Sequence, residues 1–268
     1  MIYSLQNNSI TKVIYNPYLD LMDMKGRQRY QKNVSAKERF KAYENVFDES
    51  TMRAIFKLSS QGYFDDLKGT IKIGKEANVF SATKGDGLVA IKIYRKSANF
   101  KKMYEYMAPD PRFSGLKRNK TNIIYSWAKK EYRNLLRARS AGLKVPKPIA
   151  VYNNILVMEF IGDKDAAQQM NKDKPTTSEL KSFYETLIKD LKKLYVEGKI
   201  VHADISEFNI LNYNGKPVII DFSHAVDIKY PNVKQLLERD VKILVRFFKR
   251  QGLKIDEDKE WAKWTVKN

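Results

Sequence analysis

The stretch His-Ala-Asp-Ile-Ser-Glu-Phe-Asn at residues 202–209 decides the fold, together with Ile-Ile-Asp-Phe-Ser at residues 219–223. Asp204 and Asn209 lie five residues apart, and Asp221 follows Asn209 after twelve more. Phosphoryl transfer needs a carboxylate near the attacking hydroxyl or water, and oxygen ligands for Mg²⁺. The pattern therefore predicts Asp204 as the catalytic aspartate, with Asn209 and Asp221 as metal ligands.

Either aspartate alone would be interpreted as a turn or helix-capping residue, which is the common role of aspartate in loops. All three residues at this spacing, between an expected long helix and a hairpin, favour phosphate chemistry instead. The pattern His-x-Asp, four residues, Asn, followed by Asp-Phe, resembles the signature of protein kinases.

A second signal is Lys92, which ends the apolar run Val-Ala-Ile-Lys at residues 89–92. A lysine inside an apolar strand is costly to bury unless it is paired, and kinases place one there to hold the α- and β-phosphates of ATP. Glu131 is the expected partner, because it shares a helix face with apolar residues. The alternative is an edge-strand lysine whose ammonium group reaches water.

The segment Ile-Gly-Lys-Glu-Ala-Asn-Val at residues 73–79 precedes the Lys92 strand, where a phosphate-covering loop is expected. It holds one glycine, so it is neither a Gly-x-Gly-x-x-Gly loop nor a Walker A loop. Gly74, Lys75 and Glu76 are nevertheless the candidates for contact with ATP, and Lys75 could meet phosphate charge directly. Taken alone, the segment would be an ordinary turn.

Hydrophobic periodicity predicts the remaining elements. A helix is expected over 48–61, capped by Asp48 or Ser50, with Met52, Ile55, Phe56 and Ser59 on its inner face. Strands over 70–94 contain a hairpin at residues 85–87, and a basic, flexible insertion follows at 97–120. Further helices are expected at 126–140, 178–197 and, as the last helix, 233–250, with strands at 149–152, 155–160, 210–213 and 217–220.

This order predicts a two-lobed α+β protein with a kinase-like fold, which has extra N-terminal helices, a small antiparallel sheet lobe and a reduced, mostly helical second lobe. The expected divisions are an N-terminal arm at 1–45, an N-lobe with a leading helix at 46–161, and a C-lobe at 162–268. Only 47 residues follow Asp221 in the chain of 268, which leaves no room for the usual peptide-docking elements of a protein kinase.

The net charge of +19 is expected to attract polyanions such as nucleic acid. General solubility, or the charge-rich surface of a thermophile protein, would give the same composition. The absence of cysteine excludes disulfides and thiolate metal sites. No run of 18 apolar residues and no secretory signal is evident, so we expect a cytoplasmic protein without membrane contact.

At this point the motifs resemble the RIO family of atypical serine/threonine protein kinases, in its first, archaeal-like branch. The resemblance covers about residues 45–250. It rests on the loop at 74–79, on Tyr-Ser-Trp-Ala-Lys-Lys-Glu-Tyr-Arg-Asn-Leu at 125–135, on residues 202–211, and on Asp221-Phe222-Ser223, which stands in place of Asp-Phe-Gly.

The resemblance implies an ATP- and Mg²⁺-dependent kinase or ATPase, with Mn²⁺ as a substitute metal, acting in small ribosomal subunit maturation. It assigns catalysis to Asp204, ATP contact to Lys92, and metal binding to Asn209 and Asp221, with a phosphoaspartate forming at Asp221. Adenine would be held by the backbone of the hinge Met158, Glu159, Phe160 and Ile161. Autophosphorylation would fall on Ser114 in the insertion, or on Ser97. The implied partners are ATP and the pre-small-subunit particle or its rRNA, with no DNA specificity.

The sequence departs from this branch at two points. Lys72 and Ile73 stand where a serine-threonine pair is usual, which removes two hydroxyls near the phosphates. Ala203 replaces a glycine in the catalytic loop, which we expect to be a mild change.

Two other functions fit the sequence. A non-catalytic RNA- or ribosome-binding module could keep a kinase fold as a scaffold, which the positive charge favours. A small-molecule phosphotransferase related to aminoglycoside or choline kinases would also lack the peptide lobe, but the lysine-rich insertion argues against the acidic pocket that such enzymes use.

Overall fold

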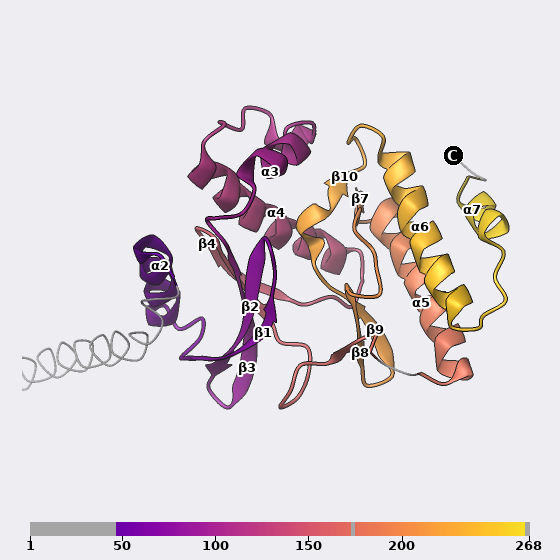
Figure 1. The fold of residues 1–268 in the computed structure, drawn as a ribbon, viewed down its shortest axis with the longest axis horizontal. Coiled ribbons are helices and arrows are strands. Elements are labelled where there is room, and N and C mark those ends of the chain that lie inside the picture. Colours follow the sequence, from indigo (N-terminus) through magenta and orange to yellow (C-terminus); the bar gives the residue numbers. More distant parts are fainter. Residues whose placement is uncertain (1–46, 173–174, 266–268) are drawn as a thin grey trace, which may run out of the picture.

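The computed structural model describes residues 47–172 and 175–265, and the predicted N-terminal arm at 1–45 lies outside them. The first half of the described chain is built on a five-stranded antiparallel sheet with strand order β1-β2-β3-β5-β4 (Figure 1). The strands are β1 (Leu67–Ile73), β2 (Ala77–Lys84), β3 (Gly87–Tyr94), β4 (Pro148–Tyr152) and β5 (Ile155–Glu159). The strand and hairpin predictions for this region are confirmed, apart from shifts of one to three residues at the ends.

The β2–β3 hairpin sets the direction in which Lys92 points. Lys84 pairs with Gly87, and Gly85 in the turn has the positive φ of 56° that such a turn requires. Side chains alternate between the two faces of a strand. Val89, Ile91 and Ile93 therefore pack into the apolar cluster under helix α2, and Lys92 points to the opposite face.

Helix α2 (Glu49–Ser60) covers one face of the sheet (Figure 1). The Asp48 side chain accepts hydrogen bonds from the backbone N–H groups of Ser50 and Thr51, each at 3.1 Å, so the predicted cap is confirmed. The prediction of its inner face was partly wrong. Only Ile55 of the four predicted residues is fully buried, and the others on that face are Thr51, Ala54 and Leu58.

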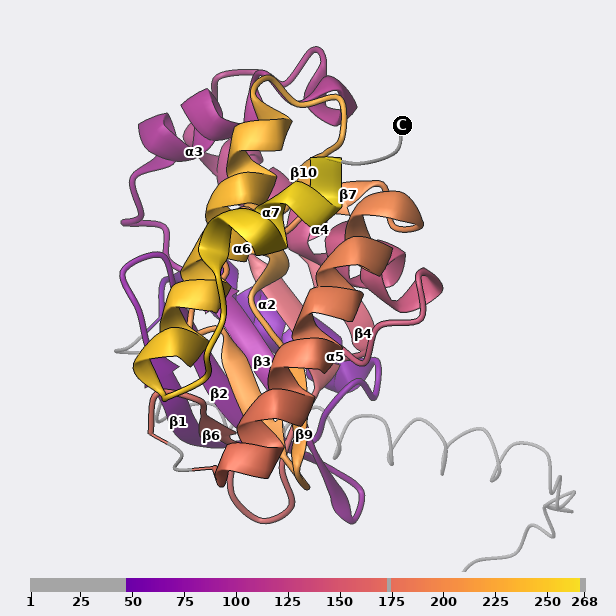
Figure 2. The ribbon, with the colours of Figure 1, turned by 90° about the vertical axis from the view of Figure 1, so that its right-hand side faces the viewer.

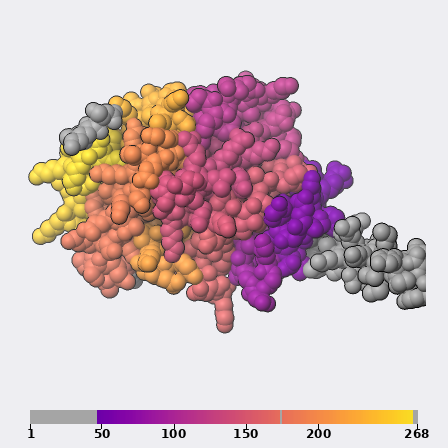
Figure 3. Space-filling view, turned by 180° about the vertical axis from the view of Figure 1, so that it is seen from behind, coloured from indigo at the N-terminus to yellow at the C-terminus, as the bar shows by residue number. Residues whose placement is uncertain are grey.

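Helix α4 (Lys120–Ser140) packs on the other side of the sheet and begins six residues before the predicted start, with the Asn119 side chain as its cap. The segment at 97–120 was expected to be a flexible insertion, and this was wrong. It forms helix α3 (Phe100–Met107) and the 3-10 turn η2 (Pro111–Phe113). Met103 and Met107 are buried against α4 residues such as Trp127, because α3 presents an apolar stripe that a mobile loop would leave in water. From behind, the segment forms a continuous part of the molecular surface (Figure 3).

The second half of the chain packs helices α5 (Thr177–Val196) and α6 (Val233–Arg250) around an apolar core. Thr176 and Glu179 form a reciprocal capping box at the start of α5. The prediction that 233–250 is the last helix was wrong, because α7 (Glu257–Thr265) follows and packs against α6 (Figure 2). Two small sheets flank the loop at 202–209 and the turn at 220–225. One consists of β6 (Gln168–Gln169), β8 (Ile210–Tyr213) and β9 (Lys216–Ile219), and the other of β7 (Ile200–Val201) and β10 (Val226–Asp227).

Within residues 47–172 and 175–265, no helix is long and apolar enough to cross a membrane.

Candidate active site

Three charged residues predicted from separate motifs meet between the two halves of the molecule. The Lys92 Nζ lies 2.9 Å from Glu131 Oε1 and 2.7 Å from Asp221 Oδ1. Strand β3 places the lysine, α4 places the glutamate, and the end of β9 places the aspartate. Tyr94, two residues after Lys92 on the same strand face, donates its hydroxyl to Glu131 Oε2. The predicted inward orientation of Glu131 is confirmed, and Tyr94 is a partner that the sequence motifs did not indicate.

Burial and charge act against each other on this cluster. Burial would lower the pKa of Lys92, but Asp221 and Glu131 outweigh it and raise the pKa above its usual value. Burial would raise the pKa of Asp221, but Lys92 and the hydroxyl of Ser223 hold it well below its usual range. For Glu131 burial prevails, and its pKa is raised. Lys92 and Asp221 are therefore both charged at neutral pH.

The catalytic loop is positioned by a buried carboxylate on α6. Asp240 accepts hydrogen bonds from the backbone N–H of Ala203 at 2.6 Å and of Ile205 at 3.3 Å, on either side of Asp204. Arg239, the preceding residue, donates to the Ala203 carbonyl. Burial raises the pKa of Asp240 to about 7 although both N–H groups favour its charged form. Sequence reasoning missed Asp240, whose position in an amphipathic helix carries no motif.

Ala203 has a φ of 63°, in the left-handed region that glycine adopts without strain. This explains why a glycine would suit the position, and the structure accommodates alanine there. Asp204, the next residue, has a half-exposed side chain. Burial, with the nearby Asp221 charge, raises the pKa of Asp204. The Asn209 Nδ2 donates to the Asp204 carbonyl at 2.9 Å and to its Oδ2 at 3.1 Å.

Asp221 also has a left-handed backbone, with a φ of 63°, and leads directly into the 3-10 turn η3 (Phe222–His224). Ser223 Oγ donates to Asp221 Oδ1 at 2.8 Å. His224 Nδ1 lies 3.9 Å from Asp204 Oδ2, so the turn brings a histidine close to the catalytic loop. Burial lowers the pKa of His224 to about 4, which leaves this imidazole neutral at pH 7.

A cavity of about 470 Å³ opens beside this cluster, with Lys92, Glu131 and Asp221 in its wall. Its apolar surfaces come from both halves: Val79 and Ala90 on the sheet, and Leu211 and Ile220 on the other side. The predicted hinge, Met158 through Ile161, also lines it. A cavity that has both apolar and charged walls suits a nucleotide, whose base is apolar on both faces and whose phosphates are anionic.

The loop at residues 74–79 borders the site with a tight turn. A Cβ on Gly74 would lie 2.7 Å from the Ala77 carbonyl oxygen, closer than real contacts allow, so the loop requires glycine there. Gly74, Lys75 and Glu76 are not among the residues that line the cavity. Lys72, which the sequence showed as a departure from the family pattern, does line it, and so does Lys172. Burial, with Asp221 nearby, raises the pKa of Glu76.

The predicted metal ligands fit a hard cation that is completed by phosphate oxygens. Asp221 Oδ1 is engaged by Lys92 and Ser223, and Asn209 donates its Nδ2 to Asp204. Asp221 Oδ2 and the side-chain Oδ1 of Asn209 are therefore the oxygens that would face a cation. In the part of the chain that the structure describes, no cluster of three or more His, Cys, Asp or Glu forms a metal cage. This agrees with Mg²⁺, which binds through one or two protein ligands together with substrate phosphates.

Ser114 and Ser97, the candidate phosphorylation sites, are both exposed, at the end of η2 and in the turn before α3. Neither lies in the wall of the cavity.

The RIO domain family matches residues 78–260 of this chain. The chain is 41% identical over 227 residues to the RIO-type serine/threonine-protein kinase Rio1 of Haloferax volcanii, covering 82% of this chain and 76% of that protein. It is 37% identical over 230 residues to the Rio1 of Methanocaldococcus jannaschii, covering 84% and 79%. It is 32% identical to the human serine/threonine-protein kinase RIO1 over 257 residues, which cover 94% of this chain and 45% of the human protein.

Among solved structures, the fold is similar to that of the Rio2 kinase from Chaetomium thermophilum in its ADP/Mg²⁺-phosphoaspartate complex. The TM-score is 0.57 at 20% sequence identity, covering 77% of this chain and 64% of that one. At this identity the likeness concerns the fold, which is a mixed α/β, kinase-like architecture.

Proposed function

Since the chain belongs to the RIO1-type serine/threonine-protein kinases, we propose that it binds ATP with Mg²⁺ in the cavity beside Lys92 and transfers or hydrolyses the γ-phosphate at Asp204. The match to the RIO domain family confirms the resemblance that the sequence motifs indicated. The likeness to the Rio2 kinase structure confirms the predicted kinase-like fold with its antiparallel sheet. The observation that carries the proposal is the meeting of Lys92, Glu131 and Asp221 in the wall of one cavity.

Each residue of the site has a distinct proposed role. Lys92, held by Glu131, meets the α- and β-phosphates. Asp204 accepts the proton of the attacking hydroxyl or water, for which its raised pKa suits it better than an ordinary aspartate. The backbone of Met158 through Ile161 holds the adenine, and the loop at Gly74, Lys75 and Glu76 covers the phosphates.

Asn209 and Asp221 would hold Mg²⁺, or Mn²⁺ in its place, and the metal when bound neutralises charge on the phosphates. Lys92 also forms an ion pair with Asp221 Oδ1, at 2.7 Å, so the group that would meet the phosphates lies next to the carboxylate that would hold the metal. The Rio2 complex is described as a phosphoaspartate, and Asp221 is the position at which such a species would form in this chain.

We further propose that the chain divides near residue 161 into an N-lobe at 46–161 and a C-lobe at 162–268, and that the described residues after Asp221, 222–265, form no peptide-docking region. After Asp221 the described chain holds η3, β10, α6 and α7, and α6 and α7 pack on the core of their own half. A partner much larger than a peptide suits such a site. We propose the pre-small-subunit ribosomal particle, in the cytoplasm, with this kinase acting as an ATP-gated factor.

The test is turnover of labelled ATP by the full chain, with and without small-subunit particles. Asp204→Ala is expected to lose roughly 10²–10⁴ in rate, the usual contribution of a general base. Asp86→Ala, in the exposed β2–β3 turn, is the matched control and should keep the wild-type rate. Equal rates for Asp204→Ala and wild type would overturn the assignment of Asp204. Transfer to aminoglycosides or choline in preference to protein or water would instead indicate a small-molecule phosphotransferase.

The net charge of +19 supports RNA contact as a second, compatible function. If lysine and arginine side chains bind rRNA phosphates, the logarithm of affinity should fall linearly with the logarithm of salt concentration. The slope should be about −0.9 per contact on duplex and about −0.7 on single strands. A chain that binds RNA in this way but does not bind ATP–Mg²⁺ would be a non-catalytic scaffold.

A further inference from the structure

The turn that follows Asp221 is held by side chains from one other region of the protein. Asn134 Nδ2 donates to the Phe222 carbonyl at 2.8 Å, and Lys130 Nζ donates to the Ser223 carbonyl at 2.6 Å. The Tyr106 hydroxyl donates to the His224 carbonyl at 2.8 Å. Asn134 Nδ2 also donates to the Ala225 carbonyl at 2.9 Å, and so does Arg112 Nη2, at 3.2 Å.

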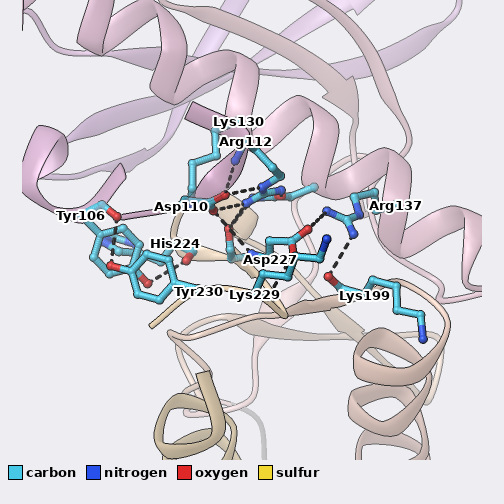
Figure 4. A network of polar contacts seen from close by, with 12 residues as sticks. Tyr106, Asp110, Arg112, Lys130, Arg137, Lys199, His224, Asp227, Lys229 and Tyr230 are labelled. Atoms are coloured by element: carbon cyan, nitrogen blue, oxygen red, sulfur yellow. Dashed lines mark hydrogen bonds and ion pairs between the residues drawn. The ribbon is translucent and has the colours of Figure 1, made fainter. Parts of the chain in front are cut away.

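Four consecutive carbonyls, from residues 222 to 225, therefore each accept a side-chain hydrogen bond. All the donors lie between residues 106 and 134, in α3, in η2 and in α4. We call these four side chains, Tyr106, Arg112, Lys130 and Asn134, the carbonyl clamp. Figure 4 shows Tyr106, Arg112 and Lys130 converging with His224 and Asp227.

The donors are held in place by contacts of their own. Asp110 is fully buried and forms an ion pair with Arg112 at 2.7 Å, and Arg112 Nη1 donates to Asn134 Oδ1 at 2.6 Å. The Lys130 ammonium lies 5.0 Å from the centre of the Trp127 ring, and Lys130 and Asn134 are 0% exposed. Buried lysine and asparagine side chains are costly unless paired, so these contacts fix the conformation of both the donors and the turn.

The clamp acts one residue away from a strained position. Asp221 has a left-handed backbone, which is unfavourable for a residue other than glycine, and such a conformation persists only where the surroundings enforce it. The conformation determines where the Asp221 carboxylate points. The turn η3, which the clamp holds, begins at the next residue.

We propose that the carbonyl clamp positions the Asp221 carboxylate for the metal, so that the folded segment at 97–120 and helix α4 are part of the metal-binding apparatus without touching the metal. The inference rests on the proposed role of Asp221 as a metal ligand. Tyr106, Arg112, Lys130 and Asn134 are positioning residues, because each acts through the backbone of residues 222–225. The sheet lobe thereby controls a metal ligand that belongs to the other half of the chain.

Similar contacts from α3 and α4 hold the residues that follow the turn, in β10 and beyond it. Arg137, one turn after Asn134 on α4, donates to Asp227 Oδ2 at 2.8 Å and to the Lys199 carbonyl at 3.0 Å (Figure 4). The Tyr230 hydroxyl donates to the Tyr106 carbonyl at 3.0 Å. Residues 222–225, Asp227 and Tyr230 are therefore all hydrogen-bonded to residues of α3, η2 or α4.

The test uses two conservative variants of the full chain, each with a neighbour as control. Lys130→Met keeps the apolar stem but removes the donor to Ser223, and Lys129→Met changes an exposed lysine next to it. Tyr106→Phe removes only the hydroxyl, and Tyr104→Phe removes the hydroxyl of the neighbouring tyrosine on α3. The measurements are the Mg²⁺ concentration for half-maximal ATP turnover, the affinity for nucleotide without metal, and hydrogen exchange of residues 221–226.

Both clamp variants are expected to need about 10- to 100-fold more Mg²⁺, the usual effect of losing an outer contact of a metal ligand. Both clamp variants should bind metal-free nucleotide with the affinity of wild type, and the backbone amides of residues 221–226 should exchange hydrogen faster. Both control variants should match wild type in all three measurements. If Lys130→Met fails to fold, Tyr106→Phe decides alone. A wild-type Mg²⁺ requirement with unchanged exchange would overturn the clamp.

Asp221→Asn separates this inference from the proposed function. If Asp221→Asn is inactive while both clamp variants behave like wild type, the clamp is wrong and the proposed site stands. If Asp221→Asn turns over ATP like wild type, Asp221 is not the metal ligand, and the proposed function and the clamp both fall.

Discussion

The Nζ of Lys92 lies 2.7 Å from Oδ1 of Asp221, although 129 residues separate them in the chain. The contact joins the sheet half of the protein to the turn that follows β9. It pairs a buried ammonium group with the carboxylate that we assign to the metal.

Replacing Lys92 by methionine should destabilise the protein as well as abolish turnover. The substitution leaves Glu131 buried beside Asp221 without a cation, and breaking a buried ion pair in this way costs about 3–5 kcal/mol. Chemical denaturation should show the loss, and Lys68→Met, on the exposed side of β1, should show almost none.

That loss should depend on pH. Burial raises the pKa of Glu131 and Lys92 lowers it in part, so removing Lys92 should raise this pKa further. The variant should therefore lose more stability than wild type as pH rises, and its penalty in unfolding free energy should be larger at pH 8 than at pH 5. A penalty that is constant over this range would mean that Lys92 does not lower the pKa of Glu131.

Asp240 should make the protein less stable as pH rises from about 4 to about 7. Burial raises its pKa from the usual 3.8 to about 7, so the folded state keeps a proton that the unfolded state loses in this window. The difference between the unfolding free energies of wild type and Asp240→Asn should therefore fall over this window, by on the order of 4 kcal/mol. Denaturation of both proteins from pH 4 to pH 8 measures it, and a flat difference would contradict a protonated Asp240.

Gly74→Ala should weaken nucleotide binding. The added Cβ would lie 2.7 Å from the Ala77 carbonyl oxygen, so the loop must open to accept it. We expect at least a tenfold rise in the Kd for ATP–Mg²⁺, which is about 1.4 kcal/mol. The matched control is Gly69→Ala on β1, where the added Cβ meets open space, and its Kd should be that of wild type. Equal affinities for the two variants would show that the turn does not support the nucleotide.

Asp48→Ala should cost about 0.5–2 kcal/mol in unfolding free energy, because α2 loses its cap. Burial would raise the pKa of Asp48, but Lys96, Thr51 and Ser50 outweigh it and lower the pKa well below its usual range. The stabilisation from Asp48 is therefore present above pH 4 and is lost as pH falls through the folded-state pKa. The difference in Tm between variant and wild type should become smaller toward low pH. A difference in Tm that becomes larger there would contradict the assigned cap.

Several site residues were predictable because they stand in short motifs. Asp204, Asn209 and Asp221 follow a spacing that phosphoryl transfer requires, and Lys92 is conspicuous in an apolar strand. Asp240, Lys130 and Asn134 were not predictable in this way. Each is a polar residue on an amphipathic helix, and its burial becomes evident only when the helix is placed against the loop that the side chain contacts.

The segment at 97–120 was also not predictable from the sequence, because its composition favours a loop and its fold depends on α4. Its lysines, prolines and glycine indicate a mobile loop, and composition offers no reason to expect otherwise. Met103 and Met107 become core residues because α4 supplies an apolar surface beneath them, and Asp110 is buried because Arg112 pairs with it.

The sequence by itself determined most of the strands, the helices with a clear apolar stripe and the candidate catalytic groups, because helix periodicity, strand alternation, capping and motif spacing are set by interactions within a few residues. Only the tertiary structure decided which charges meet. The pairing of Lys92 with Asp221, the hold of Asp240 on the catalytic loop, and the carbonyl clamp on residues 222–225 each join segments at least 35 residues apart. Such contacts form because packing removes water from both groups at the same time. A pattern within a few residues of sequence does not predict which distant segments pack together.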